Sequence, residues 1–150
     1  MVTVRKALSK DIESIAKFQV EMAWETEHFR LDPQTVRKGV EAVFADENKG
    51  QYLVAECNSQ VIGSALTVYE WSDWRNGTVL WIHSVYVHKD FRRQGVFKNI
   101  YLHVKNIVNT RQDLKGIRLY VDKTNLLAQK VYKSLEMNGD HYRLFEWMKE

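Results

Sequence analysis

With 150 residues, 45% of them hydrophobic and 27% charged, the chain is predicted to form one globular domain, residues 1–150. Its net charge of +3 is too small to indicate a nucleic-acid partner, and its only cysteine, Cys57, excludes an intrachain disulfide and a cysteine-ligated zinc site. We find no leader pattern and no apolar run of about 20 residues, so we expect a cytoplasmic location and no membrane partner.

The first part of the chain predicts a short strand followed by two helices. The strand is expected at residues 2–5, and Ser9 suits the N-cap of the first helix. The positions that this helix would bury recur at spacings of three and four: Ile12, Ile15, Phe18 (or Ala16) and Met22. Asp32 and Pro33 suit the N-cap and the first position of a second helix. The apolar face of that helix would consist of Val36, Val40, Val43 and Phe44.

Residues 51–77 predict an antiparallel hairpin that leads to a central strand. Strands are expected at residues 51–57 and 61–71, with a turn at residues 58–59 between them. Gly63, inside the second strand, indicates a bulge or a close approach of two backbones. Asn76-Gly77 is a strong turn signal, and the central strand is expected from Thr78 onward.

Residues 80–101 carry the main functional signal. A buried strand is predicted to end at Val87, a basic turn contains Arg92, Arg93 and Gly95, and apolar residues recur at helical spacing from Val96. Amides in the first turn of a helix have no acceptor inside it, and the helix dipole adds partial positive charge there. Such a turn therefore suits a phosphate group. The alternative is that the glycine only permits a tight turn and that the arginines are solvated.

The rest of the chain predicts one more strand and helix and then a closing pair of strands. A strand is expected at residues 116–121, and a helix follows Asn125. The closing strands are expected at Met137 and at residues 142–148. The predicted order is β-α-α-β-β-β-α-β-α-β-β. Helices then flank both faces of a mixed central sheet, which is an α/β (α+β) fold class.

The turn that follows residues 84–87 resembles the acetyl-coenzyme A loop of the GCN5-related N-acetyltransferase (GNAT) family. Its sequence is similar to the family pattern Arg/Gln-x-x-Gly-x-Gly/Ala, except that Phe97 stands where the family has a small residue. The resemblance implies an acetyl-coenzyme A donor whose diphosphate contacts Arg92, Arg93, Gln94, Gly95, Val96, Phe97 and Lys98. It also implies two splayed parallel strands, with the pantetheine arm along the first of them at Val85, Tyr86 and Val87. We expect the Phe97 ring to point away from the diphosphate, into the protein.

A second resemblance concerns the helix after Asn125. The spacing from Asn125 through Ala128 to Tyr132 matches the family's Asn-x-x-Ala-x-x-x-Tyr, and this helix, including Lys133, is implied to contact the cofactor. In many relatives the tyrosine protonates the departing thiolate, and a phenol with a pKa near 10 can do so at neutral pH. The alternative is a core tyrosine. Glu136 replaces the glycine that relatives have after this helix, so we expect a strained residue or a different turn there.

His83 is our candidate for the base. Several polyamine-type relatives have a glutamate at the corresponding place on the central strand, and an imidazole with a pKa near 6.5 can deprotonate an ammonium group. The alternative is that His83 is a hydrogen-bonded core residue. The other histidines show no metal-ligand pairing, and we predict no metal.

The acceptor-binding residues are expected among acidic and aromatic side chains. Carboxylates attract an ammonium group and indole faces hold cations. The candidates are Trp24, Glu25, Glu27, Trp71, Asp73 and Trp74, together with Glu21. Solvated acids and ordinary packing tryptophans explain the same residues equally well. Residues 69–74 also resemble the diamine acetyltransferase subgroup, which favours a small amine over a protein lysine.

Together these observations predict an N-acetyltransferase that moves an acetyl group from acetyl-coenzyme A to a primary amine by direct attack in a ternary complex. The partner would be a small-molecule amine, and the resemblance makes a homodimer possible. The alternative is a non-catalytic acyl-coenzyme A binding or regulatory module on the same fold. A nucleotide-binding protein is a weaker alternative, because the sequence lacks Gly-x-x-x-x-Gly-Lys-Ser/Thr and any Rossmann glycine set.

Overall fold

The computed structural model describes residues 1–150 and divides into two compact units, residues 1–118 and residues 119–150. The first unit contains a five-stranded sheet in the order β1-β2-β3-β4-β5, in which only β4 and β5 run parallel. The strands are β1 (Val2–Lys6), β2 (Gln51–Cys57), β3 (Gln60–Ser72), β4 (Gly77–Val87) and β5 (Leu114–Arg118). The α-helices of this unit are α1 (Ile12–Glu27), α2 (Pro33–Ala45) and α3 (Val96–Thr110). Short 3₁₀ helices are η1 (Ser9–Asp11), η2 (Glu47–Lys49) and η3 (Lys89–Phe91).

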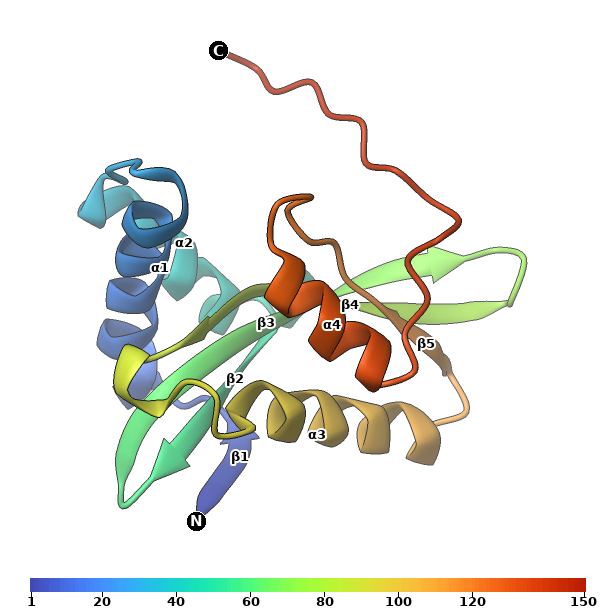
Figure 1. Cartoon of the computed structure of the whole chain (residues 1–150), viewed down its shortest axis with the longest axis horizontal. Coiled ribbons are helices and arrows are strands. Elements are labelled where there is room, and N and C mark those ends of the chain that lie inside the picture. The colour runs from blue at the N-terminus through green and yellow to red at the C-terminus, as the bar shows by residue number, and fades with distance from the viewer. The chain divides into compact units, whose positions relative to one another are not determined.

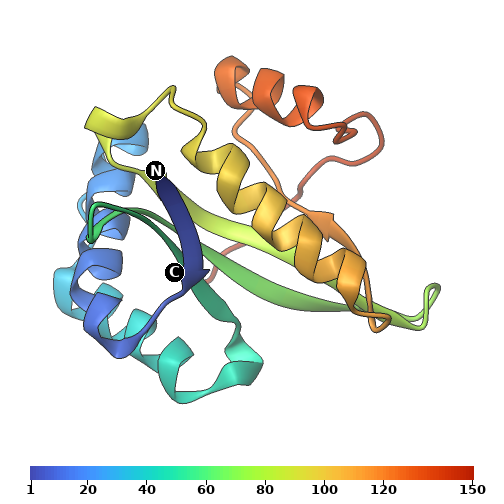
Figure 2. The ribbon, with the colours of Figure 1, turned by 90° about the horizontal axis from the view of Figure 1, so that it is seen from below.

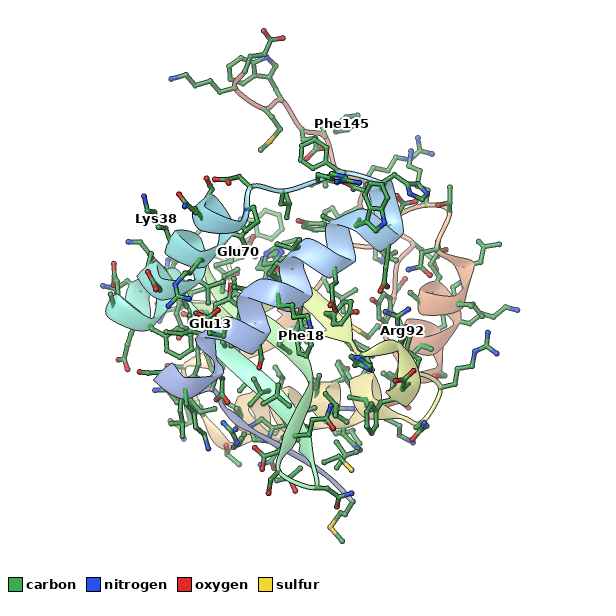
Figure 3. All side chains as sticks on the ribbon, turned by 90° about the vertical axis from the view of Figure 1, so that its left-hand side faces the viewer. Glu13, Phe18, Lys38, Glu70, Arg92 and Phe145 are labelled. Atoms are coloured by element: carbon green, nitrogen blue, oxygen red, sulfur yellow. The ribbon has the colours of Figure 1, made fainter.

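The sheet of the first unit lies between two helical layers. The helices α1 and α2 cover one face and α3 covers the other (Figures 1 and 2). Figure 3, which looks onto α1, shows Phe18 on the inner side of that helix. The buried positions of α3 are Val96, Ile100, Tyr101 and Val104. The predicted class, a mixed sheet with helices on both faces, is confirmed.

The start of α1 differs from the prediction. Ser9 is not an N-cap, because it lies in η1, one 3₁₀ turn ahead of α1. The carboxylate of Asp11 serves the preceding turn instead, accepting a hydrogen bond of 2.7 Å from the Leu8 amide. It is also paired with Arg5 at 2.7 Å, which explains how a carboxylate that is 3% exposed is tolerated in the core. The expected start of α2 is confirmed, since the Thr35 amide donates to Asp32 Oδ2 at 3.0 Å.

Two irregularities shape the pairing of β3 with β4. A Cβ on Gly63 would lie 2.9 Å from the carbonyl oxygen of Tyr86, so glycine is needed there for close approach of the two backbones. Further along, the register passes from Leu66 opposite His83 to Ser64 opposite Tyr86. Between these two pairs β4 contains one residue more than β3. Ser84, in this part of β4, takes a left-handed conformation with φ of 52°. This is a β-bulge in β4.

The second unit contains α4 (Leu126–Ser134) and no strand. The predicted strand at residues 116–121 is the shorter β5, and the closing strands predicted at Met137 and residues 142–148 are wrong. The apolar side chains of the last segment are exposed: Tyr142, Leu144, Phe145, Trp147 and Met148. Strand propensity describes how well side chains fit a paired, half-buried sheet, and alternation in the sequence does not supply a partner strand.

The end of α4 has the geometry expected for a glycine. Glu136 is left-handed, with φ of 66°. The Met137 amide donates to the Tyr132 carbonyl at 3.1 Å and the Glu136 amide to the Lys133 carbonyl at 3.0 Å, which is a Schellman motif. The expected strain at Glu136 is therefore confirmed. None of the helices in the structure combines the length and apolarity that a membrane crossing requires.

Candidate active site

Within residues 1–118, β4 continues beyond the point where its pairing with β5 stops, while its other edge stays paired with β3. The last paired residues are Trp81 and Arg118, and β4 extends six residues further to Val87. The His88 amide donates to Ile62 of β3 at 2.8 Å. Along a strand, the main-chain N–H and C=O groups of successive residues point alternately to the two edges. Those of Val87 therefore point to the edge of β4 that faces away from β3. An extended ligand can therefore find main-chain hydrogen-bonding groups at this edge of β4.

A basic turn and the start of α3 follow directly. Gly95 is the N-cap of α3 and is left-handed, with φ of 76°, and no side chain caps the helix. The first helical bond runs from the Asn99 amide to the Gly95 carbonyl at 3.0 Å. Amides ahead of that bond have no acceptor inside the helix, and they bear the positive end of its dipole. Arg93 and Lys98 are exposed beside them, so the local chemistry favours an anion.

Phe97 lies on the side of α3 where its ring can pack. The ring is half-buried and stacks on Tyr101, one turn further along α3, with 6.4 Å between ring centroids. Tyr101 is itself buried. This contact places the Phe97 ring against a neighbouring side chain of α3, and the expectation that the ring points away from a diphosphate stays a prediction.

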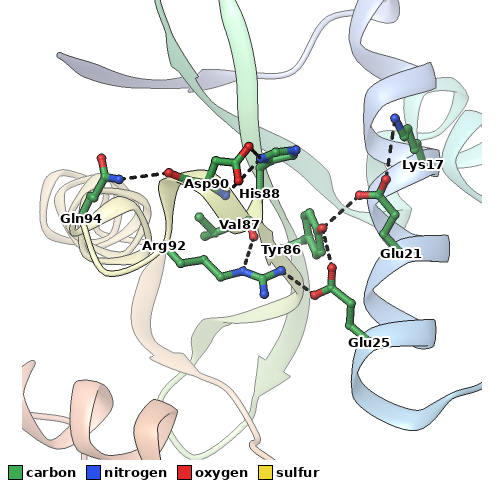
Figure 4. Close-up of polar contacts among 9 residues, drawn as sticks. All are labelled: Lys17, Glu21, Glu25, Tyr86, Val87, His88, Asp90, Arg92 and Gln94. Carbon is green, nitrogen blue, oxygen red and sulfur yellow. Dashed lines mark hydrogen bonds and ion pairs between the residues drawn. The ribbon is translucent and has the colours of Figure 1, made fainter.

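Arg92 has a different environment from the one expected. Its Nε donates to the Val87 carbonyl at 2.8 Å and its Nη2 to Glu25 of α1 at 2.6 Å, while the guanidinium lies over the Tyr86 ring (Figure 4). Gln94 donates from its side-chain amide to the Asp90 carbonyl at 3.2 Å. The guanidinium of Arg92 thus connects the end of β4 to α1, and Figure 3 shows it on the segment beside α1.

Tyr86 is the centre of this network. Its ring is buried and stacks on Phe18, and its hydroxyl lies 3.0 Å from Glu21 and 3.1 Å from Glu25. Burial and the hydrogen bond to Glu21 raise the pKa of Tyr86 above its ordinary value. The phenol is therefore protonated at neutral pH. The sequence placed only the Tyr86 main chain in the site. The signal for its side chain was the pair of acids at positions i and i+4 on one face of α1.

His83 lies on the α1–α2 face of β4. It is opposite Leu66, which packs against the core cluster beneath these helices, and cross-strand partners share a face. The imidazole is half-buried and stacks on Trp81 with 5.7 Å between ring centroids. Burial lowers the pKa of His83, so its imidazole is neutral at pH 7. A neutral imidazole can accept a proton.

The predicted acceptor residues do not form one group. Tyr86, which contacts Glu25, and Gly77, the first residue of β4 after the β3–β4 turn, are nine residues apart in one strand. At about 3.3 Å per residue this corresponds to about 30 Å. Figures 1 and 2 agree that the β3–β4 turn lies far from α1. The structure therefore separates two sets of residues: Trp24, Glu25 and Glu27 on α1, and Trp71, Asp73 and Trp74 at the β3–β4 turn.

The two sets also differ in what they contact. The face of Trp24 is covered by the guanidinium of Arg30, 4.9 Å from the ring centroid, so a ligand cation would have to compete for it. Asp73 accepts a hydrogen bond of 3.0 Å from the Trp74 amide and so helps to form the turn. Glu27 is exposed in the last turn of α1.

One ion pair near the split was not predicted. Glu70 of β3 is paired with Arg118, the residue at which β5 leaves β4. Both side chains are partly exposed. Neither residue belongs to a recognisable motif, and only the register of β3, β4 and β5 brings them together.

In the second unit, the predicted cofactor residue Asn125 is the N-cap of α4. The Asn125 side chain accepts a hydrogen bond of 3.1 Å from the Ala128 amide. Tyr132 is half-buried, and burial raises its pKa, so its hydroxyl carries a proton at neutral pH. Lys133 is exposed. No group of three or more histidine, cysteine or acidic residues in the chain could hold a metal ion.

A mixed sheet in which β4 extends past its parallel neighbour β5 and leads to a glycine-bearing basic turn is the arrangement expected of a coenzyme A-dependent acyltransferase. The chain belongs to the acetyltransferase (GNAT) family, whose model matches residues 10–137. The protein is accordingly an acetyl-coenzyme A-dependent N-acetyltransferase. No curated protein matches the sequence significantly.

Solved structures agree with this assignment. A possible acetyltransferase from Clostridium difficile 630 is 41% identical, with a TM-score of 0.91 over 100% of this chain and 99% of that one. AAC(6')-Iy in complex with the bisubstrate analogue CoA-S-monomethyl-acetylneamine is 15% identical, with a TM-score of 0.79 over 99% of both chains. An aminoglycoside acetyltransferase, meta-AAC0020, from an uncultured soil metagenomic sample in complex with sisomicin is 14% identical, with a TM-score of 0.75 over 99% of this chain and 96% of that one. The last two share the fold.

Proposed function

We propose that the protein acetylates a primary amine of a small molecule, by direct attack of that amine on acetyl-coenzyme A in a ternary complex. The observation that carries the proposal is that β4 extends beyond its last pair with β5 at Trp81, with the start of α3, which no side chain caps, following at Gly95. The acetyl donor supplies a thioester carbonyl that an amine can attack. The reaction then depends mainly on holding two molecules in the correct geometry.

The residues present fit such a donor. The main chain of Val85, Tyr86 and Val87 is suited to the amide groups of a pantetheine arm, because this part of β4 has no β5 partner. The turn from Arg92 to Gly95 and the first turn of α3 are suited to the diphosphate, with Lys98 adding charge. The contact of Phe97 with Tyr101 supports a position of the ring along α3 rather than over the turn.

Two side chains are suited to move protons. An amine must lose a proton to become nucleophilic, and neutral His83 can accept that proton at a ring nitrogen, directly or through water. The hydroxyl of Tyr132 would donate a proton to the departing sulfur, since burial raises the pKa of that tyrosine and keeps it protonated.

Recognition of the acceptor is assigned to α1 and its neighbours. Glu25 is the predicted carboxylate that the network around Tyr86 places beside the end of β4. A small polyamine or aminoglycoside would suit a carboxylate at this place, and one of the structural neighbours is an aminoglycoside acetyltransferase in complex with sisomicin. Trp71, Asp73 and Trp74 lie too far from Glu25 to bind the same ammonium group.

A thiol-release screen tests the proposal. Purified protein with acetyl-coenzyme A is offered polyamines, amino acids, aminoglycosides and lysine peptides, and free coenzyme A is measured with a thiol reagent. We expect thiol release with at least one small amine and acetylated amine in equal amount by mass spectrometry. Release with lysine peptides alone would overturn the small-molecule assignment, and no release with any amine would overturn the proposed reaction.

A further inference from the structure

Arg92 makes contacts that compete with its expected role at the diphosphate. Its Nε occupies the Val87 carbonyl at 2.8 Å and its Nη2 occupies Glu25 at 2.6 Å (Figure 4). The first group lies at the edge of β4 suited to the pantetheine arm, and the second is the carboxylate assigned to the acceptor ammonium. One guanidinium therefore covers one group from each of the two substrate sites.

The position of Arg92 in the chain makes an exchange of partners possible. It follows η3 directly and lies three residues before Gly95, at the start of the basic turn. Its side chain is 43% exposed and that of Glu25 is 36% exposed, so the pair can separate without leaving a charge in the core. An exposed ion pair of this kind is weak, and contacts with a doubly charged diphosphate can exceed it.

Glu25 and Glu21 offer an internal comparison. They lie one helical turn apart on α1, and the Tyr86 hydroxyl lies within hydrogen-bond distance of both carboxylates. Only Glu25 contacts Arg92, whereas Glu21 lies 3.7 Å from Lys17. An effect that depends on the Arg92 contact must therefore appear at Glu25 and be missing at Glu21, while a general effect of negative charge must appear at both.

We propose that Arg92 is a positioning residue that passes from Glu25 to the coenzyme A diphosphate, so that binding of the cofactor uncovers the carboxylate for the acceptor amine. This inference rests on the proposed function and adds to it a coupling between the two sites, in which bound cofactor favours binding of the amine. By linkage, a ligand that separates the pair favours the second ligand, and the second favours the first to the same extent.

A double-mutant cycle on coenzyme A affinity tests the proposal without any acetylation. Isothermal titration calorimetry with coenzyme A is carried out on the wild type, Glu25→Gln, Arg92→Gln and the double variant. We expect Glu25→Gln to tighten binding about two- to fivefold, because the ion pair no longer has to open. Arg92→Gln should weaken binding about tenfold or more through the lost charged contact. In the Arg92→Gln background, Glu25→Gln should have no effect.

Glu21→Gln is the matched control, and we expect it to leave coenzyme A affinity unchanged. Equal tightening by Glu21→Gln and Glu25→Gln, or tightening by Glu25→Gln that persists without Arg92, would show a general charge effect and overturn the proposal. An unchanged affinity in Glu25→Gln would overturn it as well. Circular dichroism establishes that each variant is folded, and Arg92→Lys, which retains the charge but cannot bridge Val87 and Glu25 in the same way, replaces Arg92→Gln if that variant does not fold.

The outcome of this cycle is independent of the thiol-release screen. Coenzyme A binding is measured in the absence of an amine, so a protein that acetylates none of the amines offered still gives a readable cycle. Conversely, active enzyme with no coupling between Arg92 and Glu25 would overturn the exchange and leave the proposed function intact.

Discussion

Gly95→Ala tests whether the left-handed start of α3 is what the cofactor site requires. An added Cβ at Gly95 has no protein atom within 4 Å, so the substitution introduces no clash. The cost is conformational, because φ is 76° there and an L-residue in that region is disfavoured by about 1–2 kcal/mol. Lower entropy of the unfolded chain offsets about 0.4–1 kcal/mol. We therefore expect a net loss of stability of about 1 kcal/mol.

Gly39→Ala is the matched control. Gly39 lies in the interior of α2, its Cβ would also meet nothing within 4 Å, and its φ is not positive. The same chemical change should therefore stabilise the protein by up to about 1 kcal/mol through helix propensity. Urea denaturation followed by circular dichroism compares the two variants with the wild type. A Gly95→Ala protein as stable as wild type would show that the folded state does not need the left-handed conformation.

The same pair of variants separates stability from binding. The methyl group at Gly95 would project beside the first-turn amides of α3, so we expect coenzyme A affinity to fall about tenfold, which is about 1.4 kcal/mol. Gly39→Ala should bind coenzyme A like the wild type. If Gly95→Ala lost stability but kept its affinity for coenzyme A in calorimetry, the reasoning that places the diphosphate at this turn would be refuted.

Three further substitutions test the proton-transfer residues and the end of α4. Tyr132→Phe should lower turnover about 100-fold and leave coenzyme A affinity unchanged. Turnover equal to that of the wild type would show that Tyr132 is not the acid. Burial lowers the pKa of His83, so we expect kcat/KM to fall on the acidic side only below pH 6.5, and this fall to be missing in His83→Ala. A pH profile that His83→Ala leaves unaltered would show that His83 is not the base. Glu136→Gly should stabilise the protein by about 1 kcal/mol in urea denaturation, since φ is 66° there, and a loss of stability would contradict the assigned strain.

Most of the fold in residues 1–118 could be predicted because local signals and tertiary packing agree there. Asp32 and Pro33 begin α2 as expected, and residues 51–57 form β2 with the predicted bounds. The start of α1 could not be predicted in the same way. Ser9 has the correct residue type for a cap, but Asp11 is held by Arg5 and by the Leu8 amide. Arg5 is brought there by β1, and no local pattern reveals that contact.

The features of the candidate site that depend on local backbone conformation could be predicted from the sequence. Those that depend on tertiary contacts of the side chains could not. The glycine of the turn and the spacing to the α3 core residues indicate a strand, a turn and a helix in order. The direction of a long side chain is a tertiary property. Arg92 was expected at the diphosphate, yet its guanidinium lies between Val87 and Glu25, since α1 packs beside the end of β4. The separation of Trp71 from Glu25 likewise follows from the length of β4.

Non-glycine residues in the left-handed conformation mark positions where the backbone is strained. Outside the glycines, they occur at turns and helix ends, as at Asn58 and His28, with one exception inside a strand. That exception is Ser84, in the β4 bulge, and Arg93 follows nine positions later in the basic turn. Each such residue costs of order 1 kcal/mol or more and persists only where the surrounding structure requires it. Both lie on the segment that runs from the bulge to the start of α3, which is the segment to which we assign the proposed cofactor site.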